Sequence, residues 1–220
     1  MQTQPITIPE FATLPVPGGP KLKLGVLGSG KGSNFVAIAD AIDAGQINAE
    51  IVFVGSDVPT AGILEHARAR GLRTEYFNPG RFKTKLEPEV EERLVKTLME
   101  AGVELLVLAG YMRMVKAPLL EAYPYRIINI HPSLLPAFPG LAAWKQAFDA
   151  GVKETGCTVH FVDAGMDTGP IIAQSRVPVL PEDTAETLHA RIQKAEHQLY
   201  PAVVAAIVEA AYERARKTLL

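Results

Sequence analysis

The chain has 220 residues, of which 48% are hydrophobic, and its 22 Lys and Arg residues nearly balance 24 Asp and Glu residues. This length suits one α/β domain or two small ones, and the balanced charge gives no sign of a nucleic-acid or acidic-membrane partner. A single cysteine, Cys157, excludes an intrachain disulfide, and neither an 18-residue apolar run nor a secretory leader pattern is present, so we expect a reduced, cytoplasmic protein without a membrane span.

The first 20 residues are rich in proline, with Pro5, Pro9, Pro15, Pro17 and Pro20. Each proline fixes φ and removes a backbone donor, which disfavours a regular element. We therefore predict an extended tail over residues 1–20, either draped on the domain or disordered, and a single domain over residues 21–220.

From residue 21 onward, strand-like and helix-like patterns alternate. Strands are predicted over 21–29, 49–57, 73–78, 103–110 and 125–131, and helices over 33–45, 61–71, 86–102 and 116–124. The run "VELLVLAG" is apolar at nearly every position, which is typical of a strand buried on both faces. The alternation predicts a three-layer α/β fold of Rossmann-like type, in which helices cover both faces of a mostly parallel sheet.

After residue 131 the pattern changes. A helix is predicted over 140–151, two alternating strands over 154–163 and 170–180, and a long last helix that begins within 181–193. A short glycine-containing segment separates the two strands, so we expect an antiparallel pair added to the sheet near the C-terminus. Asp183 or Thr184 is suited to cap the last helix.

A glycine-rich segment, "GVLGSGKGSN", joins the first long strand to the first helix. Gly32, Ser33 and Asn34 open that helix, where free N–H groups and the helix dipole favour an anion such as a phosphate. The G-x-G-x-G spacing matches neither the dinucleotide-binding motif nor the Walker loop. A tight turn with a Ser or Asn cap explains the same residues equally well, so both interpretations stay open.

Asn129 and His131 stand at the end of a predicted buried strand, in "IINIHPSLLPAFPG". Alternate residues of a strand share a face, and ligands of open α/β sheets collect at the carboxyl ends of strands. A histidine exchanges protons near neutral pH, and an amide donates to a developing oxyanion. The pair therefore suits acyl transfer without a covalent intermediate. The alternative, of about equal weight, is that the two side chains only form hydrogen bonds within the fold and take no part in catalysis.

Two aspartates, Asp163 and Asp167, lie in the turn "DAGMDTGPI". A carboxylate near His131 would stabilise the imidazolium and guide a water molecule, although aspartate is also a common turn residue. The spacing alone does not choose between the two aspartates. His160 lies inside an alternating strand and is predicted to be structural, and no Cys, His or acidic cluster has metal-site spacing.

Five segments, in this order, resemble the phosphoribosylglycinamide formyltransferase family over about residues 22–205. They are "GSGKGSN", "LAGYMRMV", "INIHPSLLPAFPG", "GCTVHFVDAGMDTGPII" and "KAEHQLYP". The resemblance implies transfer of a formyl group from 10-formyltetrahydrofolate to the amine of glycinamide ribonucleotide in purine biosynthesis. It implies small-molecule substrates and no metal, and it leaves monomer and homodimer open.

The resemblance also implies roles for individual residues. The catalytic residues would be Asn129, His131 and Asp167, which favours Asp167 over Asp163 for catalysis. The implied ribonucleotide contacts are Gly32, Ser33, Asn34, Gln193 and Glu196. The implied folate pocket comprises Met112, Arg113, Val115, Val162 and Asp163.

The chain departs from the family pattern at Ala142, where family members often carry a histidine, so a polar support of the catalytic aspartate is either missing or replaced by another group. Arg81, Lys83 and Lys85 are candidates to meet the glutamate tail of the folate, and the resemblance is compatible with a cis Leu135–Pro136 bond.

Three other functions compete with formyl transfer to the ribonucleotide as interpretations of the sequence. Formyltetrahydrofolate deformylase has a similar core, but it normally carries an N-terminal regulatory domain and needs no phosphate loop. Methionyl-tRNA formyltransferase would need a basic RNA-binding domain after the last helix. A phospholigand-binding module without catalysis is the alternative from outside the enzymes.

Overall fold

The computed structural model describes residues 2–10, 12 and 14–218. Its strands are β1 Gln2–Thr3, β2 Leu22–Leu27, β3 Ala49–Ser56, β4 Thr74–Tyr76, β5 Leu105–Leu108, β6 Ile127–His131, β7 Glu154–Phe161 and β8 Ile171–Pro178. Its helices are α1 Ser33–Asp43, α2 Gly62–Ala69, α3 Pro88–Glu100, α4 Ala117–Ala122, α5 Ala143–Asp149 and α6 Ala185–Thr218. Every helix and strand predicted after residue 20 is present, with bounds that differ by a few residues.

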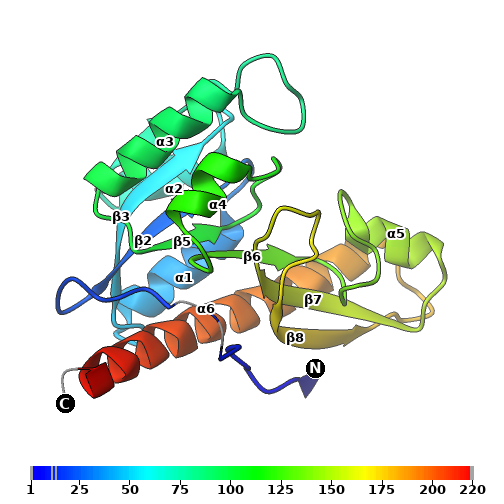
Figure 1. Cartoon of the computed structure of the whole chain (residues 1–220). Helices are drawn as coiled ribbons and strands as arrows, with labels where there is room; N and C mark the ends of the chain where they lie inside the picture. The colour runs from blue at the N-terminus through cyan, green and yellow to red at the C-terminus, as the bar shows by residue number, and fades with distance from the viewer. Residues whose placement is uncertain (1, 11, 13, 219–220) are drawn as a thin grey trace.

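One sheet contains all of these strands, in the order β1-β8-β7-β6-β5-β2-β3-β4 (Figure 1). The strands from β6 to β4 pair in parallel, whereas β7 is antiparallel to β6 and β8 is antiparallel to β7. The predicted mostly parallel sheet with an antiparallel addition near the C-terminus is therefore confirmed.

The strand order reverses between β2 and β5, because β2 leads to β3 on one side while β5 and β6 lie on the other. In open α/β sheets such a reversal opens a crevice at the carboxyl ends of the strands. The loops that follow β2 and β5 meet there, since the Ser29 N–H donates to the Gly110 carbonyl at 3.0 Å. The fold thus places the glycine-rich segment at the point where a ligand site is expected.

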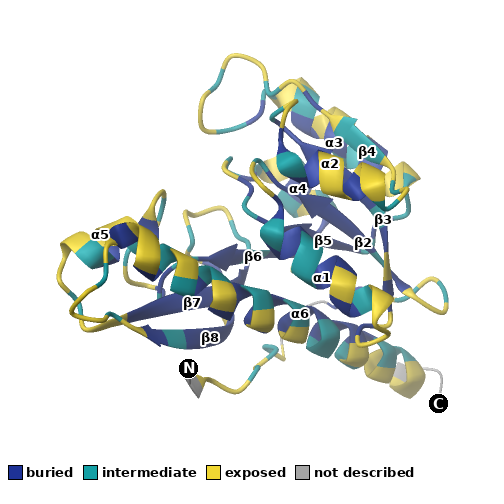
Figure 2. Cartoon of the chain, turned by 180° about the vertical axis from the view of Figure 1, so that it is seen from behind, coloured by how far each residue is buried: buried dark blue, intermediate teal, exposed yellow. Residues whose placement is uncertain are grey.

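Two hydrophobic clusters fill the layers on the two sides of the sheet. The larger cluster includes residues of α1, α2 and α6, and the smaller includes residues of α3 and α4. Figure 2 shows the strands buried between helices whose outer sides are exposed. Tyr200 of α6 is fully buried, and its hydroxyl lies 3.0 Å from the Leu108 carbonyl and 3.1 Å from the Ile128 carbonyl. This contact fixes α6 beneath β5 and β6.

The N-terminal segment adds to the free edge of β8. Gln2 and Thr3 pair antiparallel with β8, and the N–H groups of Gln4 and Thr7 continue the contact with β8 carbonyls, each at 2.9 Å. The prediction of no regular element is therefore wrong for Gln2–Thr3. An edge strand tolerates nearby prolines, because only one side of its backbone needs hydrogen-bond partners.

Further along, the same segment packs on the domain: Ala12 and Leu14 are buried in the larger cluster. Met1, Phe11 and Thr13 lie outside the described residues. The division into a tail over 1–20 and a domain over 21–220 stays a prediction. No helix among the described residues combines the length and apolar character that crossing a membrane requires.

Candidate active site

The glycine-rich loop ends in a residue that only glycine suits. Gly32 has φ 83°, in the left-handed region, and a Cβ there would lie 2.7 Å from the Cα of Ile63. Because glycine has no side chain to cap the helix, the first N–H groups of α1 are left for another acceptor. Together with the positive end of the helix dipole, they favour an anion at this position.

Asn34 joins this loop to the last helix. Its amide Nδ2 donates to Glu196 Oε2 at 2.9 Å, and both side chains are buried, while Asn34 Oδ1 has no protein partner. Burial raises the pKa of Glu196 to about 7, although the bond from Asn34 acts in the opposite direction. Gln193 lies one turn before Glu196 on α6 and is half-buried. The structure therefore brings together the residues predicted for the ribonucleotide from two distant segments.

His131 ends β6 and is 5% exposed. Its Nε2 lies 2.9 Å from the carbonyl oxygen of Phe138, and its Nδ1 lies 3.4 Å from Asp167 Oδ2. A carbonyl only accepts, so Nε2 carries a proton. A hydrogen bond between Nδ1 and Asp167 then needs one more proton, either on the ring or on the carboxyl group. The pair is therefore built to share a proton.

Asp167 adopts φ 55°, which is uncommon for a residue other than glycine, in the turn that joins β7 to β8. Its Oδ2 also accepts the Gly140 N–H at 2.8 Å, and its side chain is 15% exposed. This backbone donor supports the carboxylate where the sequence left the support open. Ala142, at the position of the family histidine, caps α5 instead, with φ 51°.

Asp163, the other candidate carboxylate, is engaged within the turn. Its Oδ1 accepts the Gly165 N–H at 3.0 Å and the Thr168 hydroxyl at 2.7 Å. These are the short-range bonds by which aspartate stabilises turns. Val162 precedes it and is partly buried. The geometry thus separates the two aspartates, with Asp167 turned to the imidazole and Asp163 turned to its own loop.

His160 lies in the same cluster, although the sequence predicted a structural role for it. The antiparallel register of β6 and β7 sets His160 opposite Asn129. Its Nδ1 lies 2.8 Å from the Phe161 carbonyl, so Nδ1 carries the proton and Nε2 accepts from Asn129 Nδ2 at 3.2 Å. Burial lowers the pKa of His160, which favours the neutral ring that this arrangement requires.

The contact fixes the orientation of the Asn129 amide and leaves its second N–H free to donate. The alternating pattern of the sequence predicts which side of the sheet His160 occupies. Only the register of β6 and β7 shows that its neighbour is Asn129.

The proline-rich loop after β6 is held by neighbouring strands. The Thr158 hydroxyl donates to the Ser133 carbonyl at 2.7 Å, and Gln174 Nε2 donates to the Leu135 carbonyl at 2.9 Å. The Leu135–Pro136 peptide bond is cis. These contacts fix the path of the loop and so the position of the Phe138 carbonyl against His131.

The residues predicted for the folate after β5 differ in how far their side chains are exposed. Met112 is 58% exposed, whereas Val115 is buried in the smaller cluster. The side chain of Arg113 is 14% exposed and pairs with Asp57 at 2.5 Å. A ligand at this loop would therefore meet the Met112 side chain and the backbone, and the assignment of these residues to the folate stays a prediction.

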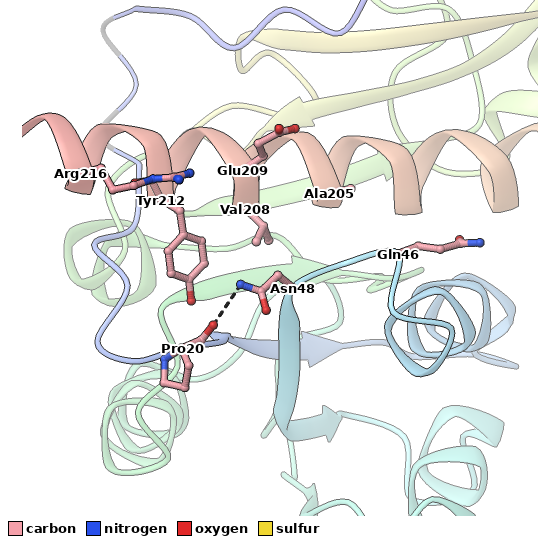
Figure 3. Close-up of a pocket in the computed structure, with 8 residues that line it drawn as sticks. All are labelled: Pro20, Gln46, Asn48, Ala205, Val208, Glu209, Tyr212 and Arg216. Carbon is pink, nitrogen blue, oxygen red and sulfur yellow. Dashed lines mark hydrogen bonds between the residues drawn. The ribbon is translucent and has the colours of Figure 1, made fainter.

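A separate pocket of about 650 Å³ lies elsewhere (Figure 3). It is lined by the C-terminal half of α6 and by Pro20 and Asn48, which precede β2 and β3, and Asn48 Nδ2 donates to the Pro20 carbonyl at 3.0 Å. These residues mark the amino ends of the parallel strands, opposite the edge where α/β sites form. Among residues 2–10, 12 and 14–218, no group of three or more His, Cys, Asp and Glu side chains is placed to hold a metal ion.

Comparison with known proteins assigns the chain to a family. The family model for formyl transferase matches residues 22–204. The phosphoribosylglycinamide formyltransferase of Bacillus subtilis (strain 168) is 47% identical over 182 residues, which cover 83% of this chain and 92% of that protein. The trifunctional purine biosynthetic protein adenosine-3 of Drosophila pseudoobscura pseudoobscura is 46% identical over 197 residues, which cover 89% of this chain but 14% of that larger protein.

A solved structure gives the same result. The glycinamide ribonucleotide transformylase 1 from Symbiobacterium toebii superposes with a TM-score of 0.83 at 47% identity, covering 87% of this chain and 90% of that one.

Proposed function

We propose roles for the site residues from one premise: the chain belongs to the formyl transferase family, as one of the phosphoribosylglycinamide formyltransferases. It moves the formyl group of 10-formyltetrahydrofolate to the amine of glycinamide ribonucleotide, a step of purine biosynthesis. The roles below are hypotheses about which side chains perform that transfer.

The ribonucleotide binds at the N-terminus of α1. Its phosphate accepts the N–H groups that follow Gly32, in the region of Ser33 and Asn34. Its ribose hydroxyls meet Glu196 and Gln193 on α6. The contact between Asn34 and Glu196, at 2.9 Å, supports this role because it places the two groups of residues side by side. The substrate amine then points along the crevice toward the end of β6.

The oxyanion is stabilised by Asn129 and His131. When the amine nitrogen attacks the formyl carbon, a C–N bond forms and the carbonyl electrons move to oxygen. Asn129 donates its free N–H to this oxygen, and His131 donates the Nε2 proton that is directed at the Phe138 carbonyl in this structure. The Asn129 donor is preorganised by its contact with His160, whereas the His131 donor exchanges the Phe138 carbonyl for the oxyanion. Donors that face the oxyanion act most strongly on charge that appears only in the transition state.

The proton transfer is assigned to Asp167. Collapse of the tetrahedral intermediate breaks the bond between the formyl carbon and N10 of the folate, and the proton lost by the amine is returned to N10. Asp167 carries this proton through His131 or an ordered water molecule. The 3.4 Å separation of His131 Nδ1 and Asp167 Oδ2 is the observation that carries the proposal.

The folate binds beside the catalytic cluster of Asn129, His131 and Asp167. It lies against Met112 and the backbone of the loop that continues through Arg113 to Val115. The turn with Val162 and Asp163 closes the other side. The exposed side chain of Met112, next to a buried and well-anchored loop, supports an apolar contact with the ring system of the donor.

Formyl transfer with and without the ribonucleotide tests the function. The expected result is release of tetrahydrofolate only when glycinamide ribonucleotide is present. Release without the ribonucleotide would instead support a deformylase, and absence of turnover under both conditions would support a binding module. The relatives with known names favour transfer over both.

The setting and the assembly of the enzyme are also proposed. A reduced, cytoplasmic location is supported by the single thiol, Cys157, which is buried and whose pKa is raised by burial. We expect a monomer or a homodimer, which sedimentation of the purified chain distinguishes.

A further inference from the structure

A buried carboxylate outside the catalytic cluster connects two loops of the site. Asp57 follows β3 and is 6% exposed. Its Oδ1 accepts the hydroxyl of Ser29 at 2.6 Å, and its Oδ2 accepts Arg113 Nε at 2.5 Å. Both oxygens thus hold a donor, one from the loop after β2 and one from the loop after β5.

The Ser29 side of this network lies within the glycine-rich loop. The Ser29 Oγ that donates to Asp57 also accepts the Met112 N–H at 3.0 Å. Its backbone N–H donates to the Gly110 carbonyl at 3.0 Å. The phosphate loop and the proposed folate loop are therefore joined at Ser29 by backbone and side chain.

The Arg113 side of the network extends to a third segment. Arg113 Nη1 lies 2.7 Å from the carbonyl of Phe82, 3.1 Å from that of Lys83 and 3.3 Å from that of Lys85. These residues belong to the basic loop over 79–87, which protrudes beyond α3 at the upper end of the molecule in Figure 1. One guanidinium, fixed by Asp57, therefore anchors the middle of this loop to the site.

We propose that Asp57 is a positioning residue that couples the ribonucleotide subsite to the folate subsite. The inference rests on the proposed function, because it takes the two loops as the two subsites. A ligand that fixes the glycine-rich loop fixes Ser29 and Asp57, and Asp57 then fixes Arg113 and the loop that follows β5. The second substrate therefore meets a loop that is already ordered, which makes its binding tighter.

The test measures the dissociation constant of glycinamide ribonucleotide alone and with saturating tetrahydrofolate, which carries no formyl group and so does not react. In the unaltered enzyme we expect tetrahydrofolate to tighten ribonucleotide binding about fivefold or more, the lower range of known coupling between sites. In Asp57→Ala, which removes both bonds, the ratio of the two constants is expected to approach one.

Two milder variants and one control make the result decisive. Asp57→Asn removes the negative charge that holds the Arg113 guanidinium, and Ser29→Ala removes the hydroxyl on the other side of the network. Each is therefore expected to reduce the ratio even where Asp57→Ala fails to fold. Asp183→Asn removes another carboxylate paired with an arginine, Arg191 at 2.6 Å, at the start of α6. It is expected to leave the ratio unchanged.

A purely structural role for Asp57 gives a different pattern. Both dissociation constants would rise together and their ratio would stay at the value of the unaltered enzyme, which would overturn the proposal. A ratio of one in the unaltered enzyme, or an equal loss in Asp183→Asn, would also overturn it. None of these results bears on the proposed function, because formyl transfer by the unaltered enzyme tests that separately.

Discussion

Two polar networks lie at the carboxyl edge of the sheet, and they differ in how fully their hydrogen bonds are made. Around Asp57 both carboxylate oxygens hold donors, at 2.6 and 2.5 Å. Around Asp167 the contacts to the two histidines are 3.4 Å and 3.7 Å. In the Asp57 network each carboxylate oxygen is thus held by a short hydrogen bond, whereas around Asp167 the contacts to the histidines are long and leave room for a substrate group.

The backbone shows the same contrast. Phe138, Ala142 and Asp167 all adopt positive φ, and among the described residues other than glycine Tyr125 is the one further case. Such conformations persist where the surrounding structure imposes them, and they gather at sites that must hold a geometry for a ligand. We infer that the Asp57 network holds the loops of the site in place, whereas the groups around Asp167 take part in the reaction. Substitutions in the site test this difference.

The largest effect is expected from Asp167→Asn. The amide cannot carry the proton to N10, so we expect kcat to fall by about 10³-fold, within the usual range for a general acid–base group. The KM for the ribonucleotide should change little, because Asp167 contacts His131, His160 and Gly140 and does not take part in the bond between Asn34 and Glu196. Steady-state kinetics with both substrates measure this. Asp163→Asn is the matched control, and turnover by Asp167→Asn close to that of the control would remove the assigned role.

Asn129→Ala is expected to have the next largest effect. Loss of one preorganised oxyanion donor costs about 10²-fold or more in kcat. His160→Phe, which removes the acceptor that orients the Asn129 amide, is expected to cost less than Asn129→Ala. The double variant should be no slower than Asn129→Ala alone, because both changes act on one donor. Additive losses would show that His160 acts independently of Asn129.

Glu196→Gln probes the ribonucleotide side of the site through pH. The folded-state pKa of Glu196, about 7, lies above its usual value, so the folded protein holds this proton to higher pH than the unfolded chain does. Its contribution to stability is present at low pH and is lost as pH rises through 7. The variant cannot ionise, so its free energy of unfolding relative to the unaltered protein should rise between pH 5 and 8, by at most about 3 kcal/mol.

Denaturant unfolding at several pH values, without substrates, measures this difference. A difference that does not change with pH would contradict the assigned burial of Glu196. With the ribonucleotide present, the KM of the variant should depart most from that of the unaltered enzyme above pH 7, where the native carboxylate is charged.

The smallest effect is expected at the opposite edge of the sheet. Tyr212 lines the pocket of Figure 3, and its hydroxyl donates to the Gly19 carbonyl at 2.9 Å. Tyr212→Phe should cost about 1 kcal/mol of stability, seen as a fall in Tm of roughly 3 °C, with kcat unchanged. A large fall in kcat would show that this edge communicates with the catalytic cluster.

Much of the fold was predictable from the sequence, because it depends on local patterns. The alternation of elements after residue 20 predicted the parallel sheet, and the period of a strand predicted that Asn129 and His131 share a face. The resemblance to a known family implied roles for residues such as Asp167 and Glu196, which no local pattern connects, and these roles stay predictions.

What the sequence did not predict depends on register and on long-range partners. His160 lies beside Asn129 because β7 runs antiparallel to β6 with one particular register. The Arg113 side chain is engaged within the protein because Asp57, 56 positions earlier in the chain, accepts its guanidinium. The pairing of Gln2–Thr3 with β8 likewise depends on an edge that exists only in the folded sheet. No spacing of residue types along the chain encodes these contacts.

The most direct test of the central claim is single-turnover formyl transfer in the unaltered enzyme and in Asp167→Asn, with both substrates saturating. The account predicts that formylated ribonucleotide and tetrahydrofolate appear together in the unaltered enzyme, and that the rate of this chemical step falls by about 10³-fold in the variant while ribonucleotide binding is retained. An unchanged chemical step in the folded variant would contradict it.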